Sequence, residues 1–201
     1  MTRLTFTPGF DGFPVWSPDG KHIVFRSDRQ GSPGNLYWMR ADGGGEAVRL
    51  TESKDQQLPF SFSPDGKRLA FVSDRSGTPQ IYVTDVQGSA PVRLTYEGRY
   101  NTAPTWSPRS DVIAFVGRAD EDRSLGVYTI RPDGSGQTRL GGGGSPDAPI
   151  WAPNGRFVMY TSTQGSSRQR YMMREDGQAN YLLPASGPAC LTSQWVARTA
   201  R

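Results

Sequence analysis

Few side chains in this 201-residue chain are suited to catalysis. The single histidine, His22, follows a Pro-Asp-Gly turn at the head of a predicted strand, and the single cysteine, Cys190, lies near the C-terminal end. A hydrolase of the Ser-His-Asp type needs that imidazole beside a nucleophilic serine, yet no Gly-x-Ser-x-Gly motif is present. A nucleophilic cysteine needs a neighbouring base in the same way. The sequence therefore predicts that this chain is not an enzyme.

Metal and phosphate sites are not expected either. The repeats place aspartates in predicted turns, where a carboxylate accepts local hydrogen bonds: Asp19, Asp42, Asp65, Asp133 and Asp176. No short Asp-x-Asp-x-Asp loop is present. The glycine runs at 43–45 and 141–144 are not followed by the Lys-Ser/Thr pair of a P-loop. One cysteine excludes an internal disulfide and a multi-thiolate metal site. We expect no cofactor and no metal ion.

The charge distribution excludes two further classes of partner. The 23 basic and 19 acidic residues give a net charge of +4, and the basic residues are scattered along the chain, so no nucleic-acid-binding surface is expected. No apolar stretch approaches the length of about 18 residues that a membrane span needs, so no membrane insertion is expected. The N-terminus lacks the apolar region of a signal peptide, which predicts a chain that is not exported as written.

An internal repeat of 44 to 46 residues organises the sequence. An aromatic residue followed by Ser-Pro-Asp-Gly, or by a variant of it, recurs four times, and the prolines of these motifs are 46, 44 and 45 residues apart. The aromatic residues of the four copies are Trp16, Phe62, Trp106 and Trp151. An Arg-Leu-Thr motif follows in the same register at 49–51 and 93–95, and without its threonine at 139–140. Two markers in one register indicate a true repeat.

Each unit is predicted to form four short strands joined by tight turns. In the Ser-Pro-Asp-Gly step, proline fixes φ and glycine adopts the left-handed conformation that closes a hairpin. Second strands such as Ile23-Val24-Phe25 are apolar on both alternating faces, so each sheet is expected to be covered on both sides. Sheets stacked in this way are the blades of a β-propeller. The predicted fold is all-β, with about four four-stranded antiparallel blades.

The expected propeller domain covers residues 1–184. Its four blades are expected at about 14–51, 59–95, 104–140 and 149–183. Arg3-Leu4-Thr5 is predicted to be an extra outer strand, and 185–201 is either a tail or, through Gln194-Trp195-Val196, the start of a further blade. Core wedges between blades are expected at Trp16, Trp106 and Trp151. Two arrangements stay open: a closed four-bladed ring, or an open arc that pairs with another copy to cover its end faces.

The motif order of aromatic-Ser-Pro-Asp-Gly, Ser-Asp-Arg and Arg-Leu-Thr resembles the WD-like propeller repeat of the TolB family over nearly all of residues 3–184. Members of that family have six blades behind an N-terminal α/β domain, whereas this sequence has four complete units and no such domain. Similar blades occur in oligopeptidases, in some sugar lyases and in sensor domains fused to kinases or regulators. The opening segment at 3–16 is most similar to the kinase-fused type.

The resemblance implies a non-catalytic propeller that binds a protein or peptide. It also implies a periplasmic location and a role in envelope integrity through a peptidoglycan-associated lipoprotein. Two alternatives remain: the detached propeller of an oligopeptidase or lyase, and the sensor domain of a kinase or regulator. A homo-oligomer also remains open as long as the end faces of the propeller have no partner.

Charged residues at the ends of the second strands are the candidate binding residues. They are Asp28, Arg29, Asp74, Arg75 and Arg118. The loop carrying Arg99, Tyr100 and Asn101 is expected on the same rim, near the central channel where propellers commonly bind ligands. One interpretation is structural, with these residues pinning turns and forming ion pairs between blades. The other is a ring of Arg and Asp that recognises a peptide or an acidic partner.

Overall fold

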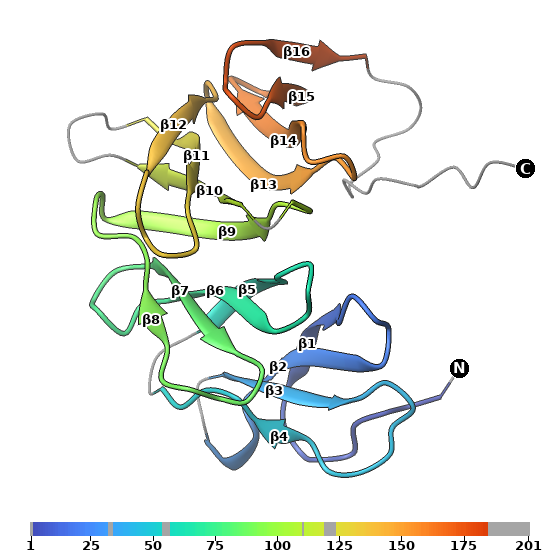
Figure 1. Ribbon diagram of the computed structural model, residues 1–201. Helices are drawn as coiled ribbons and strands as arrows, with labels where there is room; N and C mark the ends of the chain where they lie inside the picture. The colour runs from blue at the N-terminus through green and yellow to red at the C-terminus, as the bar shows by residue number, and fades with distance from the viewer. Residues whose placement is uncertain (1, 32–33, 54–56, 110, 119–123, 185–201) are drawn as a thin grey trace, which may run out of the picture.

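The computed structural model describes residues 2–31, 34–53, 57–109, 111–118 and 124–184, and this part of the chain is nearly all β (Figure 1). Sixteen strands form four antiparallel sheets, each built from four consecutive strands, as the repeat predicts. The one helical element in the described ranges is a 3-10 turn at Arg29–Gly31. None of the described segments forms a helix long and apolar enough to cross a membrane.

Each sheet is one blade, and strand order within a blade follows the chain. Blade 1 consists of β1 (Asp11–Trp16), β2 (His22–Ser27), β3 (Asn35–Arg40) and β4 (Val48–Arg49). Blade 2 consists of β5 (Gln57–Phe62), β6 (Arg68–Ser73), β7 (Gln80–Asp85) and β8 (Val92–Arg93). Blade 3 consists of β9 (Tyr100–Trp106), β10 (Ile113–Arg118), β11 (Gly126–Ile130) and β12 (Thr138–Gly141). Blade 4 consists of β13 (Ser145–Trp151), β14 (Phe157–Gln164), β15 (Ser167–Arg174) and β16 (Asn180–Leu183).

The four blades form an open arc. The first strands β1, β5, β9 and β13 lie on its inner side, and the last strands β4, β8, β12 and β16 lie on its outer side (Figure 1). Buried hydrophobic clusters join blade 1 to blade 2, blade 2 to blade 3, and blade 3 to blade 4. Among the described residues, no such cluster joins blade 4 to blade 1. Of the two arrangements that the sequence left open, the structure has the arc.

Side-chain hydrogen bonds hold the Ser-Pro-Asp-Gly turns. The Ser17 hydroxyl donates to Asp19 at 2.6 Å, and the backbone N–H of His22 donates to the same hydroxyl at 3.0 Å. The hydrogen bond from Ser17 is the main cause that lowers the pKa of Asp19. Ser63 and Asp65 repeat the arrangement in blade 2. This turn forms as the motif predicts, and it closes the hairpin between the first two strands of the blade.

The first strand of each blade contains a β-bulge that the sequence analysis did not anticipate. Pairing with the second strand shifts register in all four blades. In three of them a non-glycine residue with positive φ stands just before a proline: Phe13 at 54°, Ala103 at 51° and Ala148 at 47°. The expected blades began at these prolines, whereas the strands begin two to four residues earlier. A bulge lets the strand continue past a proline that would otherwise end its pairing.

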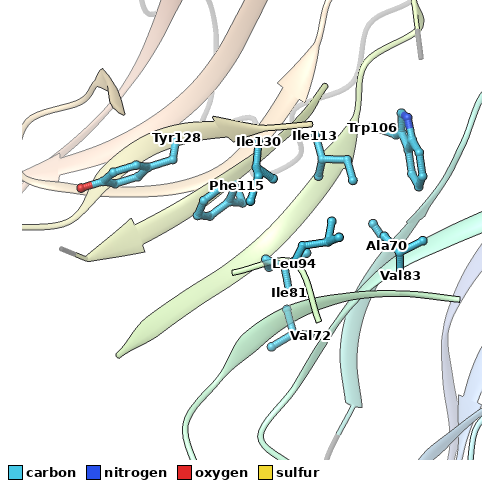
Figure 2. Close-up of a cluster of buried hydrophobic side chains, with 10 residues drawn as sticks. All are labelled: Ala70, Val72, Ile81, Val83, Leu94, Trp106, Ile113, Phe115, Tyr128 and Ile130. Atoms are coloured by element: carbon cyan, nitrogen blue, oxygen red, sulfur yellow. The ribbon is translucent and has the colours of Figure 1, made fainter. Parts of the chain in front are cut away.

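Two faces of each blade meet its neighbours, and we name them by chain order. The leading face packs on the preceding blade, and the trailing face packs on the following one. Figure 2 shows one junction, in which trailing-face side chains of blade 2 point toward leading-face side chains of blade 3. Blade 2 contributes Ala70, Val72, Ile81, Val83 and Leu94, and blade 3 contributes Trp106, Ile113, Phe115, Tyr128 and Ile130. Each internal blade is thus covered on both faces.

The three tryptophans expected as core wedges do not share one environment. Trp106 and Trp151 are 5% and 6% exposed and pack on the preceding blade. Trp16 is 58% exposed, so its prediction as a core wedge was wrong. The reason lies in the arc: Trp16 belongs to the leading face of blade 1, and no described blade packs there.

Buried polar side chains connect the blades beside the apolar clusters. Thr51 donates to Gln57, and Gln57 donates to Asn35 at 3.1 Å, so that the amide of blade 2 is bound to blade 1. Asn101 of blade 3 donates to Gln80 of blade 2 at 2.9 Å in the same way. These side chains are at most 3% exposed. Satisfying buried amides in this way keeps their burial from destabilising the fold.

The N-terminal segment corrects one further expectation. Arg3-Leu4-Thr5 does not form a strand, although it does lie against the propeller. Leu4 packs on the buried leading-face cluster of Ile23, Phe25, Tyr37 and Met39 in blade 1. The segment therefore covers part of that face as loop. The predicted tail or further blade at 185–201 lies outside the described residues.

Candidate functional site

The predicted site residues lie at one end of the blades, which we call the connection rim. Strand register pairs Asp11 with Ser27, Gln57 with Ser73, and Asn101 with Gly117. The start of each first strand therefore lies beside the end of the second, as the sequence analysis expected of the connecting loops. The Ser-Pro-Asp-Gly turns lie at the opposite end, which we call the turn rim.

Arg29 is held inside blade 1. Its Nε donates to the Ser27 hydroxyl at 2.8 Å, and its Nη2 forms an ion pair with Asp11 at 3.1 Å. The guanidinium lies 4.7 Å from the ring centroid of Tyr37 and 5.1 Å from that of Phe25. Its side chain is 13% exposed. These contacts match the structural interpretation, except that the ion pair is within one blade and not between blades.

Asp11 is the anionic half of this pair. Burial raises its pKa, but hydrogen bonds from Ser27, Arg29 and Thr5 outweigh that effect, and the pKa of Asp11 is lowered from its ordinary value. The contact with Thr5 binds the N-terminal segment to the blade. The pair is thus charged at neutral pH and stabilises the connection rim of blade 1.

Arg75 repeats the arrangement in blade 2. Its Nε donates to the Ser73 hydroxyl at 3.0 Å, and its guanidinium lies over the rings of Tyr82 and Phe71. The neighbouring aspartates of both blades are half-buried: Asp28 accepts a hydrogen bond from the backbone of Phe10, and Asp74 belongs to the turn after β6. Arg29 and Arg75 contact their own blades, and the structure does not bring them together as an open ring.

Asn101 occupies an interior position. It is 1% exposed, and its amide donates to Gln80 and to the backbone carbonyl of Glu97. A side chain that is buried and bonded in this way holds blade 3 against blade 2, and does not offer its amide to a partner.

Arg118 does not occupy the position of Arg29 and Arg75. Gly117 pairs with the start of β9 as Ser27 pairs with the start of β1, so these two residues are equivalent in the repeat. Arg118 is therefore equivalent to Asp28, one residue before the position of Arg29. It is exposed, and its guanidinium lies 5.9 Å from the ring centroid of Tyr100. Tyr100 is 39% exposed, and Arg99 beside it is also exposed. Of the eight predicted residues, these three reach the surface together.

A cavity of about 360 Å³ opens beside Tyr100, between blades 3 and 4. Blade 3 and its hairpin loop contribute Tyr100, Thr102, Val116 and Leu125 to its wall, and blade 4 contributes Ser145, Pro146, Asp147, Thr163 and Arg168. Two bulges adjoin it, because Ala103 follows Thr102 and Ala148 follows Asp147. Bulges redirect neighbouring side chains, and strained backbone of this kind is common at binding sites.

Sequence reasoning missed part of this wall. It gave no role to Arg168, whose Nη2 lies 3.5 Å from the Asp147 carboxylate. Arg168 lies in the third strand of its blade rather than in a Ser-Asp-Arg motif. The nearest signal is the two-residue Gly165-Ser166 hairpin, which brings β15 to the connection rim.

The wall is suited to recognition. Arg168 offers a cation, Tyr100 offers an aromatic face, and Leu125 and Pro146 offer apolar surface. Arg118 adds a second cation beside Tyr100, outside the wall itself. His22, by contrast, stacks on Trp38 at the turn rim, with ring centroids 4.2 Å apart. In the part of the chain that the structure describes, no cluster of three or more metal-ligating side chains is found.

Comparison with known proteins places this architecture in a family. The family model of the TolB beta propeller domain matches residues 34–197, which is most of the chain. The chain belongs to the TolB β-propeller family. The Tol-Pal system protein TolB of Bordetella pertussis is 48% identical to it over 44 residues, which are 22% of this chain and 10% of that protein.

Solved structures agree with this assignment. The crystal structure of TolB from Acinetobacter baumannii matches with a TM-score of 0.76 and 29% identity, covering 88% of this chain and 44% of that one. The matched part of this TolB-type chain thus spans less than half the length of these two TolB proteins. A puromycin-hydrolyzing peptidase of Mycobacterium tuberculosis matches with a TM-score of 0.69 and 16% identity, covering 90% of this chain and 29% of that one. At that identity the likeness concerns the fold alone.

Proposed function

We propose that this chain is a non-catalytic protein-binding propeller that acts, as TolB does by name, in a Tol-Pal system. The partner implied by the family resemblance is a peptidoglycan-associated lipoprotein, and the corresponding location is the periplasm. The observation that carries the proposal is the cavity between blades 3 and 4, which exposed Tyr100 lines together with Asp147 and Arg168, and beside which Arg118 lies at the Tyr100 ring.

The chemistry of this cavity favours a polypeptide segment with a carboxylate. Arg118 and Arg168 are exposed cations that can form charge-assisted hydrogen bonds with an acidic side chain. The ring of Tyr100 and the apolar groups of Leu125 and Pro146 suit a neighbouring aromatic or aliphatic residue. Tyrosine and arginine are the residue types in which binding energy most often concentrates at interfaces. Arg99 belongs to the same proposed surface.

A binding measurement tests the proposal. The probe is the soluble domain of the peptidoglycan-associated lipoprotein encoded in the same genome, titrated calorimetrically into the chain. Tyr100→Ala and Arg118→Ala are each expected to weaken binding by about 2 kcal/mol, roughly thirtyfold, because Tyr100 lines the cavity and Arg118 is the exposed cation beside its ring.

Tyr96 provides the matched control for Tyr100. It is also an exposed tyrosine with an arginine over its ring, Arg93 at 4.7 Å, but it does not line the cavity. Tyr96→Ala is expected to leave the affinity unchanged. Equal losses in Tyr96→Ala and Tyr100→Ala, or full affinity in Tyr100→Ala and Arg118→Ala, would refute the cavity as the binding site.

A further inference from the structure

The arc has two end faces, and each resembles one side of the junction that is repeated between its blades. At each internal junction the leading face of one blade packs on the trailing face of the blade before it. The leading face of blade 1 and the trailing face of blade 4 have the same construction, and no described blade covers either of them.

The leading face of blade 1 retains the features of a junction. Its stacked pair Phe25 and Tyr37 corresponds to Phe71 and Tyr82 in blade 2. Leu4 lies on this face as Leu50 lies on the leading face of blade 2. The two Arg-Leu-Thr segments also have the same local hydrogen bond. The Nε of Arg3 donates to the Thr5 carbonyl at 2.6 Å, and the Nε of Arg49 donates to the Thr51 carbonyl at 2.9 Å.

The N-terminal segment buries most of this face but does not fill it completely. Leu4, Pro14, Ile23, Phe25 and Met39, among others, line a mainly apolar cavity of about 180 Å³. At the junction of blades 1 and 2, the corresponding side chains of Leu50, Leu69 and Phe71 form one buried cluster with Val24 and Leu36 from the trailing face of blade 1. The cavity therefore lies where a trailing face would insert its side chains, and Trp16 stands exposed beside it.

The trailing face of blade 4 carries the complementary groups. Met159 and Met172 are cross-strand partners, as Val24 and Trp38 are in blade 1, and Tyr181 pairs with Met172 on the adjoining outer strand. Tyr181 is 51% exposed and Met172 is partly buried, whereas Met159 is only 7% exposed, so Tyr181 and Met172 are the groups that this face offers. Methionine side chains adapt to irregular apolar cavities because they are unbranched and flexible.

We propose that the trailing face of blade 4 docks on the leading face of blade 1 of a second copy of this chain, head to tail. A second copy is the occupant these observations favour, because it carries both halves of a junction that the chain already forms three times. Such a contact is heterologous, so it either closes into a ring of copies or extends as a filament.

Sedimentation equilibrium of the full 201-residue chain, from low micromolar to hundred-micromolar concentrations, tests the proposal. Association is expected for the unaltered chain. Trp16→Arg blocks the leading face and Tyr181→Arg blocks the trailing face, so each is expected to weaken association by about tenfold or more. Leu182→Arg is the matched control: Leu182 is the next residue on the same strand, 56% exposed on the opposite face, and its substitution is expected to leave association intact.

A mixture of the two blocked variants decides the geometry. Each variant retains the face that the other has lost, so head-to-tail docking predicts one-to-one dimers in the mixture and monomers in either variant alone. A mixture that stays monomeric while the unaltered chain associates would overturn the head-to-tail contact. An unaltered chain that is monomeric throughout would overturn the proposal itself. If association then appeared on removing residues 185–201, that segment would be the occupant of the trailing face instead.

Discussion

At the level of single residues, the ion pair of Asp11 and Arg29 couples the stability of blade 1 to pH. The pKa of Asp11 is lowered by the fold, so its ionised form contributes stability at pH values above the ordinary value of 3.8. That contribution is lost as the pH falls below 3.8 and through the lowered pKa of the folded state.

Asp11→Asn is therefore expected to destabilise the chain by about 1 to 3 kcal/mol at pH 7, because a charge-assisted hydrogen bond from Arg29 is lost. The difference from the unaltered chain should shrink as the pH falls below 3.8, and urea unfolding across that range measures it. Repeating the substitution in an Arg29→Met background should reduce its effect. A difference that is the same at every pH would show that the charge of Asp11 contributes nothing.

The site residues differ in how far sequence could predict them. The Ser-Asp-Arg motif locates Arg29 and Arg75 on the rim, but their guanidinium groups lie over aromatic rings that are supplied by the second and third strands of the same blade. Arg118 has a different environment because it directly follows Gly117, which stands at the serine position, and so takes the position of the aspartate. Arg168 lies in no repeated motif, and the short Gly165-Ser166 hairpin indicates only that its strand reaches the connection rim.

At the level of elements, replacing the tryptophan that ends a first strand measures how much the junction between two blades contributes to stability. Trp106→Ala should destabilise the chain by about 3 to 5 kcal/mol, because its ring fills the buried cluster between blades 2 and 3 (Figure 2). Trp16→Ala is the natural comparison, since Trp16 has the same repeat position but is 58% exposed. Its cost in the monomer should be below about 1 kcal/mol.

Chemical denaturation at low protein concentration measures both variants. If Trp106→Ala unfolded at the same denaturant concentration as the unaltered chain, Trp106 would have no role as a wedge. If Trp16→Ala cost as much as Trp106→Ala, the leading face of blade 1 would be covered in solution even in the monomer.

The strands themselves were predictable from the repeat, because turn chemistry and apolar alternation are local. Ser17 and Asp19 define their turn by hydrogen bonds within six residues of chain, and that information is contained in the motif. The bulges were not predictable in this way. Ala103 and Ala148 adopt positive φ under the constraint of pairing with the second strand, whereas the prolines after them suggest that a strand begins there.

At the level of the whole molecule, the fold is a linear stack in which each blade contacts its neighbours in the chain. The sequence predicts the blade but not the closure of the stack, because the curvature depends on how successive faces pack. Arrays of this kind derive stability from each unit and from each interface between neighbours. Blades 2 and 3 have two such interfaces, whereas the described part of the chain gives blades 1 and 4 one each.

Hydrogen exchange should therefore reveal a gradient of stability along the arc. In a dilute sample, backbone amides of β2 and β3 in blade 1 are expected to exchange about tenfold or more faster than those of β6 and β7 in blade 2, because the terminal blade opens with the loss of a single junction. Mass spectrometry of peptides from these strands measures the ratio. Uniform protection in all four blades of a dilute sample would mean that the molecule unfolds only as a whole. A ratio that falls toward one as the protein concentration rises is what head-to-tail docking requires, since docking gives blade 1 the second junction that blade 2 has within the chain.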